Sequence, residues 1–350
     1  MSPVTFSDNV QRNTYGKPDS PRPWTRGIPH IQPCYAYSTE HDVWQAFDTT
    51  QDSKIEAVAL DKIEVLSWNI DFMRILDEAR MKAALKHLRT HVEAVDSKGV
   101  PKVIMLNEMT VPDLRLIQAQ DWVRQDYHVT DITAEHWESE GYGTCMLIPK
   151  ALSIAQVCRI HYTITPMERD ALFVDIRMGT PSSGMGVESA TVITSTKPRI
   201  LRLCSTHLES LRSSPPRRPR QLAEAAAYMH SATYAVIGGD MNAIQDFDET
   251  LHDENGLKDA YLELGGVEGA EEGMTWGQTA SIAERERYGL CRMDKFLFCG
   301  EGLEVEHFER FGEDVEVEGV EDRETLIEEV EMEKAWVTDH LGIKAVFSIK

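Results

Sequence analysis

The sequence predicts a layered domain of mixed α and β structure whose strands form two sheets. From about residue 61 onward, short apolar runs rich in β-branched and aromatic residues recur between turn residues, as buried strands do. Helical patterns separate only some of these runs, so strand and helix do not alternate regularly. The chain has 350 residues, 42% of them hydrophobic, which is enough for a large core.

The predicted elements follow one another from residue 63 to the C-terminal end. A helix is expected over 74–95, where apolar side chains recur every three or four residues. A second helix is expected over 219–232, because Pro219 suits the first turn of a helix. The runs of strand length are 63–68, 103–106, 143–149, 171–178, 199–206, 234–239, 295–299 and 343–349.

Three segments fall outside this pattern of strands and helices. Residues 1–60 are rich in Pro, Tyr, Ser and Thr and are weakly periodic, so we expect a partly ordered N-terminal arm. Residues 61–350 are expected to form one domain. Within it, 180–198 and the acidic segment 301–334 predict loop or hairpin insertions. The aromatic residues that would dock the arm are Trp24, Tyr35, Tyr37 and Trp44.

The net charge of −22 makes nucleic-acid binding less expected without excluding it. Residues 301–334 hold 15 acidic and 3 basic side chains, so this segment carries more than half of the excess negative charge. A phosphate group can still bind where metal ions and a few arginines gather. Arg212, Arg217, Arg218 and Arg220 form one basic stretch, which fits a solvated loop as well as backbone contact.

Cysteine usage and the absence of apolar spans indicate the compartment. Six scattered cysteines without a CxxC pair are typical of reduced core residues. The N-terminal residues lack the pattern of a signal peptide, and no apolar run approaches the roughly 18 residues of a membrane span. We therefore expect an intracellular protein of the nucleus or cytoplasm, monomeric and without membrane contact.

Polar side chains follow or precede several of the predicted strands. Because a rigid sheet can direct such side chains into one cleft, they are candidates for a site. Carboxylate and amide oxygens suit Mg²⁺ or Mn²⁺, and an Asp–His pair suits proton transfer or stabilisation of charge on a phosphate. The set predicts metal-assisted hydrolysis of a phosphoester. Its members are Asn69, Glu108, His207, Asp240, Asn242, Asp294, Asp339 and His340.

Each of these residues also has a structural explanation when taken singly. An asparagine after a strand, such as Asn69, is most often a turn residue. An aspartate in GGDMN is more often a turn residue than a ligand, and His207 alone fits a hydrogen-bonded core position. Compatible chemistry at five separate strand ends is what favours a common site.

The motifs, in this order, resemble the endonuclease/exonuclease/phosphatase superfamily, which has the DNase I-like fold. The resemblance implies a four-layer sandwich, in which two packed mixed sheets are flanked by helices, and one Mg²⁺-dependent hydrolytic centre. The matching motifs are SWNID (67–71), LNE (106–108), STHLES (205–210), GGDMN (238–242), RMDKF (292–296) and TDHLG (338–342).

Within this superfamily, the chain is similar to the phosphodiesterases that remove tyrosine from DNA 5′ ends. The similarity lies in WNID, EGYGT (140–144), THLESLR (206–212), MTW (274–276) and MERDALFV (167–174). It implies DNA 5′ ends, single-stranded, as the substrate. Residues in contact with that substrate would be Asp71, Tyr142, Arg169 and Trp276, although a core position suits Trp276 equally well.

The resemblance also implies a role for each site residue. Glu108 would be the main metal ligand, with Asn69 beside it and Asp339 supporting the metal or its water. Asp240 and Asn242 would position the attacking water and the phosphate. In the same scheme, His340 held by Asp294 would stabilise the charge of the transition state, and His207 would contact a phosphate oxygen.

Several residues differ from those usual in the phosphodiesterases that remove tyrosine from DNA 5′ ends. Hydrolysis of a phosphodiester is therefore a firmer expectation than the DNA substrate. Asn107 stands where glutamine is usual, Phe72 stands in place of a glycine, and Lys295 is a conservative change. Ala243 and Ile244 replace a Leu-Arg pair whose arginine helps to bind DNA. A relative that acts on RNA, a nucleotide or a phospholipid headgroup remains an alternative, and so does a non-catalytic binding protein.

Overall fold

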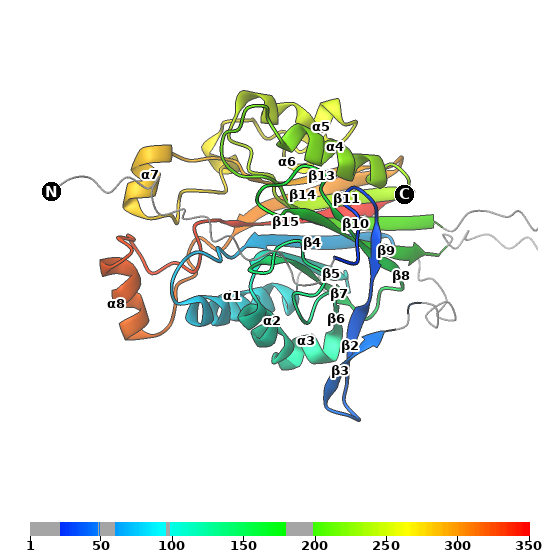
Figure 1. The fold of residues 1–350 in the computed structure, drawn as a ribbon, viewed down its shortest axis with the longest axis horizontal. Coiled ribbons are helices and arrows are strands. Elements are labelled where there is room, and N and C mark those ends of the chain that lie inside the picture. The colour runs from blue at the N-terminus through cyan, green and yellow to red at the C-terminus, as the bar shows by residue number, and fades with distance from the viewer. Residues whose placement is uncertain (1–21, 48, 50–59, 96–98, 180–198) are drawn as a thin grey trace, which may run out of the picture.

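Two packed sheets with helices on both outer sides form the domain, as Figure 1 shows, which confirms the predicted fold class. The computed structural model describes residues 22–47, 49, 60–95, 99–179 and 199–350. The insertion predicted over 180–198 therefore lies outside the described residues. No helix within these ranges is long and apolar enough to cross a membrane.

Within the described residues, the first sheet has seven strands and the second has eight. The order in the first sheet is β1-β8-β9-β10-β11-β13-β12, and in the second it is β14-β15-β4-β5-β7-β6-β2-β3. The bounds in the first sheet are β1 His30–Gln32, β8 Ile154–His161, β9 Asp170–Met178, β10 Arg199–His207, β11 Tyr234–Asp240, β13 Asp294–Cys299 and β12 Lys258–Asp259. Those in the second are β14 Leu303–Phe311, β15 Gly342–Ile349, β4 Lys62–Asn69, β5 Lys102–Met109, β7 Gly143–Pro149, β6 Tyr127–Val129, β2 Cys34–Ser38 and β3 Val43–Phe47.

Helices cover the outer face of each sheet (Figure 1). The helices on the second sheet are α1 Asp77–Val92, α2 Val111–Gln118 and α3 Asp121–Asp126. Those on the side of the first sheet are α4 Arg218–Met229, α5 Leu251–Glu254 and α6 Ala260–Glu263. Two further helices, α7 Ile282–Tyr288 and α8 Val320–Glu328, lie at one end of the sandwich.

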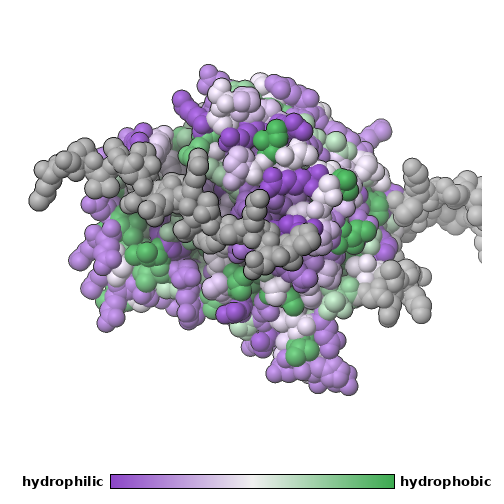
Figure 2. Space-filling view, viewed as in Figure 1, coloured by the Kyte–Doolittle hydropathy of each residue, from purple (hydrophilic) through white to green (hydrophobic). Residues whose placement is uncertain are grey.

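The inner faces of the two sheets share one hydrophobic core. Val65 of β4 and Met105 of β5 belong to the same buried cluster as Leu203 of β10 and Val236 of β11. The α1–α3 helices pack on the other face of the second sheet through a separate cluster, and α4 and α5 do the same on the first sheet. Outside these cores, the face in Figure 2 is largely hydrophilic, with small separate hydrophobic areas.

One pair of parallel strands at the centre of each sheet determines where the polar strand ends lie. β4 runs parallel to β5 with Asn69 opposite Asn107, and β10 runs parallel to β11 with His207 opposite Asp240. Strands that run in the same direction finish at the same edge of their sheet. The polar residues that follow these four strands are therefore brought to one end of the sandwich.

The N-terminal arm adds strands to both sheets. β1 pairs with β8 of the first sheet, whereas β2 pairs with β6 and β3 in the second. Two of the tryptophans expected to dock the arm do so through their indole N–H groups. Trp24 Nε1 donates to Glu138 Oε2 at 2.8 Å, and Trp44 Nε1 donates to the Gln118 carbonyl oxygen at 3.2 Å.

The segment 301–334, expected to be a loop or hairpin insertion, contributes a strand and a helix to the domain. Its first part is β14, which pairs antiparallel with β15 at the edge of the second sheet, and its later part contains α8. Leu303, Phe311, Val317 and Leu326 are buried, while most of the acidic side chains between them face solvent. These few apolar residues pack the segment against the second sheet. The many acidic residues around them obscured this apolar pattern in the sequence.

A buried arginine explains why β8 was not predicted. Arg159 interrupts the apolar run of this strand, yet its side chain is fully buried. Its guanidinium donates to Asp131 Oδ2 at 3.0 Å, to Asp170 Oδ1 at 2.6 Å and to Gln32 Oε1 at 3.1 Å. Arg159 therefore links the arm, the strand β8 and the start of β9 through satisfied buried charges.

Replacement of Arg159 by methionine should destabilise the fold strongly. The Arg159→Met variant leaves two buried carboxylates without their cation, which costs about 3–5 kcal/mol of unfolding free energy. The matched control is Arg89→Met, because Arg89 is 55% exposed and pairs only with the exposed Glu93, a contact worth less than about 0.5 kcal/mol. Urea unfolding at pH 7 measures both values, and equal losses would contradict the assignment.

Candidate active site

Asp240 joins the two sheets at the end of the sandwich. Its Oδ2 atom accepts a hydrogen bond from Asn69 Nδ2 of the second sheet at 3.1 Å. The same oxygen lies 3.2 Å from His207 Nε2, on the neighbouring strand of its own sheet. Its Oδ1 atom accepts the backbone N–H of Asn242 at 2.8 Å. The side chains of Asn69 and His207 and the backbone N–H of Asn242 therefore meet at one carboxylate.

Asn107 and Gly239 explain how the two sheets approach so closely here. Asn107 Nδ2 donates to the Thr206 carbonyl oxygen at 3.2 Å, and Asn107 Oδ1 accepts the Asp240 N–H at 3.2 Å. At Gly239, with φ +139°, a Cβ atom would lie 1.9 Å from the Thr206 oxygen. Only glycine fits this position, and Asn107, a departure from the usual glutamine, binds both strands of the opposite pair.

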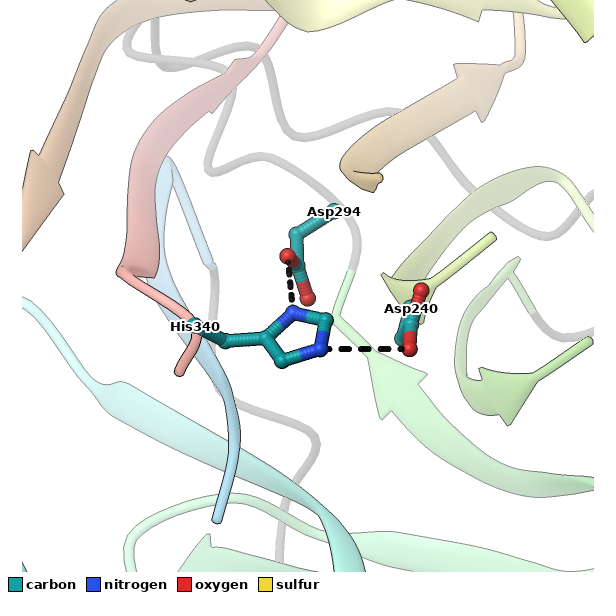
Figure 3. Close-up of side chains that lie close together, drawn as sticks. All are labelled: Asp240, Asp294 and His340. Carbon is teal, nitrogen blue, oxygen red and sulfur yellow. Dashed lines mark hydrogen bonds and ion pairs between the residues drawn. The ribbon is translucent and has the colours of Figure 1, made fainter. Parts of the chain in front are cut away.

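His340 lies between Asp294 and Asp240, as Figure 3 shows. His340 Nδ1 is 2.8 Å from Asp294 Oδ2, and its Nε2 is 3.7 Å from Asp240 Oδ2. Burial of the ring favours the neutral form, but the two carboxylates outweigh it and raise the pKa of His340 well above its usual value. His340 is therefore an imidazolium at neutral pH and can donate a proton or stabilise negative charge.

His207, unlike His340, is neutral at pH 7, and its neighbours explain why. Its burial, together with the nearby Arg169 guanidinium, lowers the pKa of His207 to about 4. Arg169 Nη1 lies 2.5 Å from His207 Nδ1, and a guanidinium can only donate. Nδ1 is then the acceptor, so the proton of the neutral ring is on Nε2, which faces Asp240 and Glu108. His207 thus presents an N–H donor to the cleft.

These two histidines keep Asp240 ionised. Burial alone would favour the neutral acid, but His340 and His207 lower the pKa of Asp240 below its usual value. A buried carboxylate that stays charged between a cation and a neutral N–H donor is suited to hold and orient a water molecule through a hydrogen bond, while its lowered pKa makes it a weak base. Asn242, which has φ +48°, donates from Nδ2 to Asp240 Oδ2 at 3.2 Å and fixes the carboxylate further.

Glu108 lies in a second, more acidic part of the cleft. Burial raises the pKa of Glu108 to about 7, and the Asp71 and Asp339 carboxylates add to this rise. Asp71 is also raised in pKa, by burial first and then by Asp339, although Arg74 Nε lies 3.1 Å from its Oδ2. Glu108 has φ +61°, a strained backbone for this residue type, and strain of this kind occurs at functional sites.

The donor chemistry of this acidic part fits a divalent metal ion. Glu108, Asp71 and Asp339 offer oxygen ligands only, and their mutual repulsion is relieved by a hard cation. Asp240, Asp294 and His340 have ligating atoms within 4.8 Å of one another. Among the described residues, it is this group and not Glu108, Asp71 and Asp339 whose ligating atoms lie so close together. His340 Nδ1 is bound to Asp294, so a metal ion at this group would compete with that contact.

The other predicted residues differ in how they meet the cleft. Asn69 Oδ1 accepts the Asp71 N–H at 3.0 Å, which places the amide of Asn69 between the acidic part and Asp240. Trp276 is only 8% exposed and donates from Nε1 to Asp339 Oδ2 at 2.8 Å. Its burial favours the alternative of a core tryptophan, which here orients Asp339.

The basic stretch after THLES is largely structural in this arrangement. Arg218 is buried and forms an ion pair with Asp248 at 2.6 Å, while its Nη1 donates to the carbonyl oxygens of Glu209 and Leu211. Arg220 pairs with Glu224 on the surface of α4. Arg220 therefore fits the alternative of a solvated helix start, whereas Arg218 is a buried structural residue, which neither alternative anticipated.

Sequence analysis missed two arginines that support the cleft. Arg74 neutralises Asp71 and reaches Glu284 of α7 at 3.4 Å. Arg80 is buried in α1 and donates to the carbonyl oxygens of Ile70 and Val337, which joins the segment after β4 to the segment before His340. Both lie in a stretch predicted as an amphipathic helix, where an arginine is expected on the solvated face, so no signal distinguished them.

The fold, two packed mixed sheets flanked by helices, defines a class of hydrolases that act on phosphodiester bonds. Residues 66–340 match the Endonuclease/Exonuclease/phosphatase family over most of the chain. The chain belongs to this family, and its predicted class, a hydrolase of phosphodiester bonds, is confirmed. Enzymes of this family generally depend on a divalent metal ion.

Several solved structures have the same fold. D. rerio TDP2 in complex with a single-stranded DNA product is 19% identical, with a TM-score of 0.59, over 82% of this chain and 99% of that one. Truncated Caenorhabditis elegans TDP2 is 19% identical, with a TM-score of 0.54, over 82% and 97%. The human Nocturnin catalytic domain with bound sulfate is 14% identical, with a TM-score of 0.54, over 83% and 95%. No curated protein matches the sequence significantly.

Divalent-metal affinity should depend on pH through Glu108. Below pH 7 the carboxyl of Glu108 is protonated, and a proton must leave before a metal ion binds, so affinity for Mn²⁺ should rise up to about tenfold per unit between pH 6 and pH 7. Calorimetry in two buffers of different ionisation enthalpy measures affinity and proton release together. Glu108→Gln should weaken binding and remove the pH dependence, whereas the exposed Glu93→Gln should change neither. A pH-independent affinity in the unmodified protein would contradict this role.

Proposed function

We propose that this chain is a Mg²⁺-dependent phosphodiesterase that hydrolyses the 5′-phosphotyrosyl–DNA linkage at single-stranded DNA ends. The observation that carries the proposal is the ionised Asp240 between protonated His340 and neutral His207, beside the acidic group around Glu108. The sequence likeness to phosphodiesterases of DNA 5′ ends supports the substrate. So does the likeness in fold to D. rerio TDP2, which was solved with a single-stranded DNA product.

Asp240 acts on the attacking water in this proposal. Its carboxylate accepts a proton from the water, and Asn242 holds that carboxylate in place through two hydrogen bonds. Water then attacks the phosphorus directly, opposite the leaving phenolate, without a covalent enzyme intermediate. The short contact between Asn69 Nδ2 and Asp240 Oδ2 orients the same carboxylate from the other sheet.

The two histidines act on the phosphate oxygens. His340 donates as an imidazolium and stabilises the charge that develops in the transition state, while Asp294 holds its ring through Nδ1. His207 donates from Nε2, because Arg169 occupies its Nδ1. The positive charge and the neutral donor thus approach the phosphate from the two sides of Asp240.

The metal ion would be held by Glu108 and Asn69, with Asp339 supporting the ion or its water. When bound, Mg²⁺ supplies Lewis-acid stabilisation of a phosphate oxygen and of the leaving oxygen. Trp276 and Thr338 keep the Asp339 side chain in position, through hydrogen bonds of 2.8 Å and 3.4 Å. Asp71, Tyr142 and Arg169 would form the substrate side of the cleft.

A related activity on RNA, nucleotides or phospholipid headgroups is the second candidate. The replacement of the branch's DNA-binding arginine by Ala243-Ile244 favours it. A non-catalytic binding protein is less well supported, because the complete set of predicted metal and water groups is present in the sequence and gathered at one end of the sandwich.

Tyrosine release from a single-stranded oligonucleotide with a 5′-phosphotyrosyl end tests the proposal. We expect release with Mg²⁺, none with EDTA, and a loss of about 100-fold or more in Glu108→Gln and Asp240→Asn. Asp253→Asn is the matched control, because its side chain is 79% exposed and remote from these contacts.

Two other outcomes lead to different conclusions. Activity on a generic aryl phosphodiester without tyrosine release would keep the chemistry and discard the substrate. Absence of activity on both substrates would favour a binding protein that retains the fold.

A further inference from the structure

The backbone of Phe72 lies next to Glu108, the proposed metal ligand, and its ring packs on another aromatic ring. Its backbone N–H donates to Glu108 Oε2 at 3.0 Å. Its ring stacks on Tyr142, with centroids 4.1 Å apart and planes 20° apart. Both side chains are partly exposed. The ring of Phe72 is therefore partly exposed, and the residue directly follows Asp71, one of the carboxylates near Glu108.

The partner ring is held firmly and is already occupied. Tyr142 donates from its hydroxyl group to the Met167 carbonyl oxygen, and the Arg169 guanidinium carbon lies 4.8 Å from the centroid of its ring. Arg169 is buried and bound to His207. Phe72, Tyr142 and Arg169 thus form one continuous stack that leads from the protein surface to His207.

Phe72 has a single aromatic neighbour among the described residues, and its side chain is partly exposed. In the part of the chain that the structure describes, Tyr142 is the one aromatic ring that stacks on Phe72, and no arginine or lysine side chain lies over it. A planar apolar ring with a single stacking partner at a partly exposed position can receive a second ring. Tyr142, in contrast, already has contacts from Phe72 and Arg169.

We infer that Phe72 is a stacking platform for an aromatic ring of the substrate next to the scissile phosphate. This inference rests on the proposed function and specifies how the substrate is selected. Stacking needs no positive charge, which suits a chain of net charge −22 that lacks the arginine of the branch. Binding should accordingly fall only weakly with added salt, because few counterions are released.

A tyrosyl-linked nucleotide offers two such rings, the first nucleobase and the tyrosyl phenol. The test uses Asp240→Asn as background, since this change suppresses turnover and leaves the contacts of Phe72 unchanged. One arm measures binding of a 5′-phosphorylated single-stranded oligonucleotide with 2-aminopurine as the first nucleotide, whose fluorescence falls when the base stacks. The other arm measures binding of phenyl phosphate by calorimetry.

In the nucleobase arm, Phe72→Leu should weaken binding about tenfold or more and remove most of the quenching. Phe72→Trp should keep both, because the platform persists. The matched control is Phe308→Leu on β14, the same change at a partly buried position elsewhere, which should leave binding and quenching unchanged.

The two arms distinguish the nucleobase from the tyrosyl ring as the group that stacks on Phe72. They also test the stacking platform independently of the proposed function. Loss of quenching identifies the nucleobase, whereas unchanged quenching with weaker phenyl phosphate binding identifies the leaving-group ring. No change in either arm on Phe72→Leu would overturn the platform, even if tyrosine release is observed. Absence of tyrosine release in the unmodified protein counts against the proposed function alone, because both binding arms are measured without turnover.

Discussion

The buried carboxylate of Asp240 is the group on which the arrangement of this cleft depends. It ends β11 of one sheet and accepts a hydrogen bond from Asn69 at the end of β4 in the other. A buried charge requires partners, and its partners include His207 and His340. The contacts that satisfy Asp240 therefore also direct the Nε2 atoms of both histidines toward one carboxylate, so stability and the geometry of the site have a common cause.

The paired parallel strands make this convergence possible. Each sheet brings the carboxyl ends of two strands to one edge, and the common core keeps those edges together. Buried polar side chains then connect the segments that leave the strands. Asn107 binds β10 and β11 from the opposite sheet, and Arg80 joins the segment after β4 to the segment before His340. The cleft is thus built on rigid strands and held by satisfied hydrogen bonds.

Much of the fold and of the candidate site was predictable because the relevant signals are local. The strand over 63–68 and the polar Asn69 that follows it could be recognised within eight residues of sequence. The edge strand β14 and the strand β8 were missed, since charged residues interrupt their apolar patterns. Arg159 is an example. Its charge is compensated by Asp131 and Asp170, which lie outside β8 in the sequence, so the pattern of that strand alone does not reveal them.

The sequence by itself determined the class of fold, the order of the motifs and the chemical types of the site residues, because periodicity and strand-end position are properties of short segments. Only the tertiary structure decided which of these residues touch and in which protonation state. His207 is neutral because of its burial and of Arg169, and His340 is charged because of Asp294 and Asp240; none of these neighbours is adjacent in sequence. The stack of Phe72 on Tyr142 arises in the same way, from two strand ends that only folding brings together.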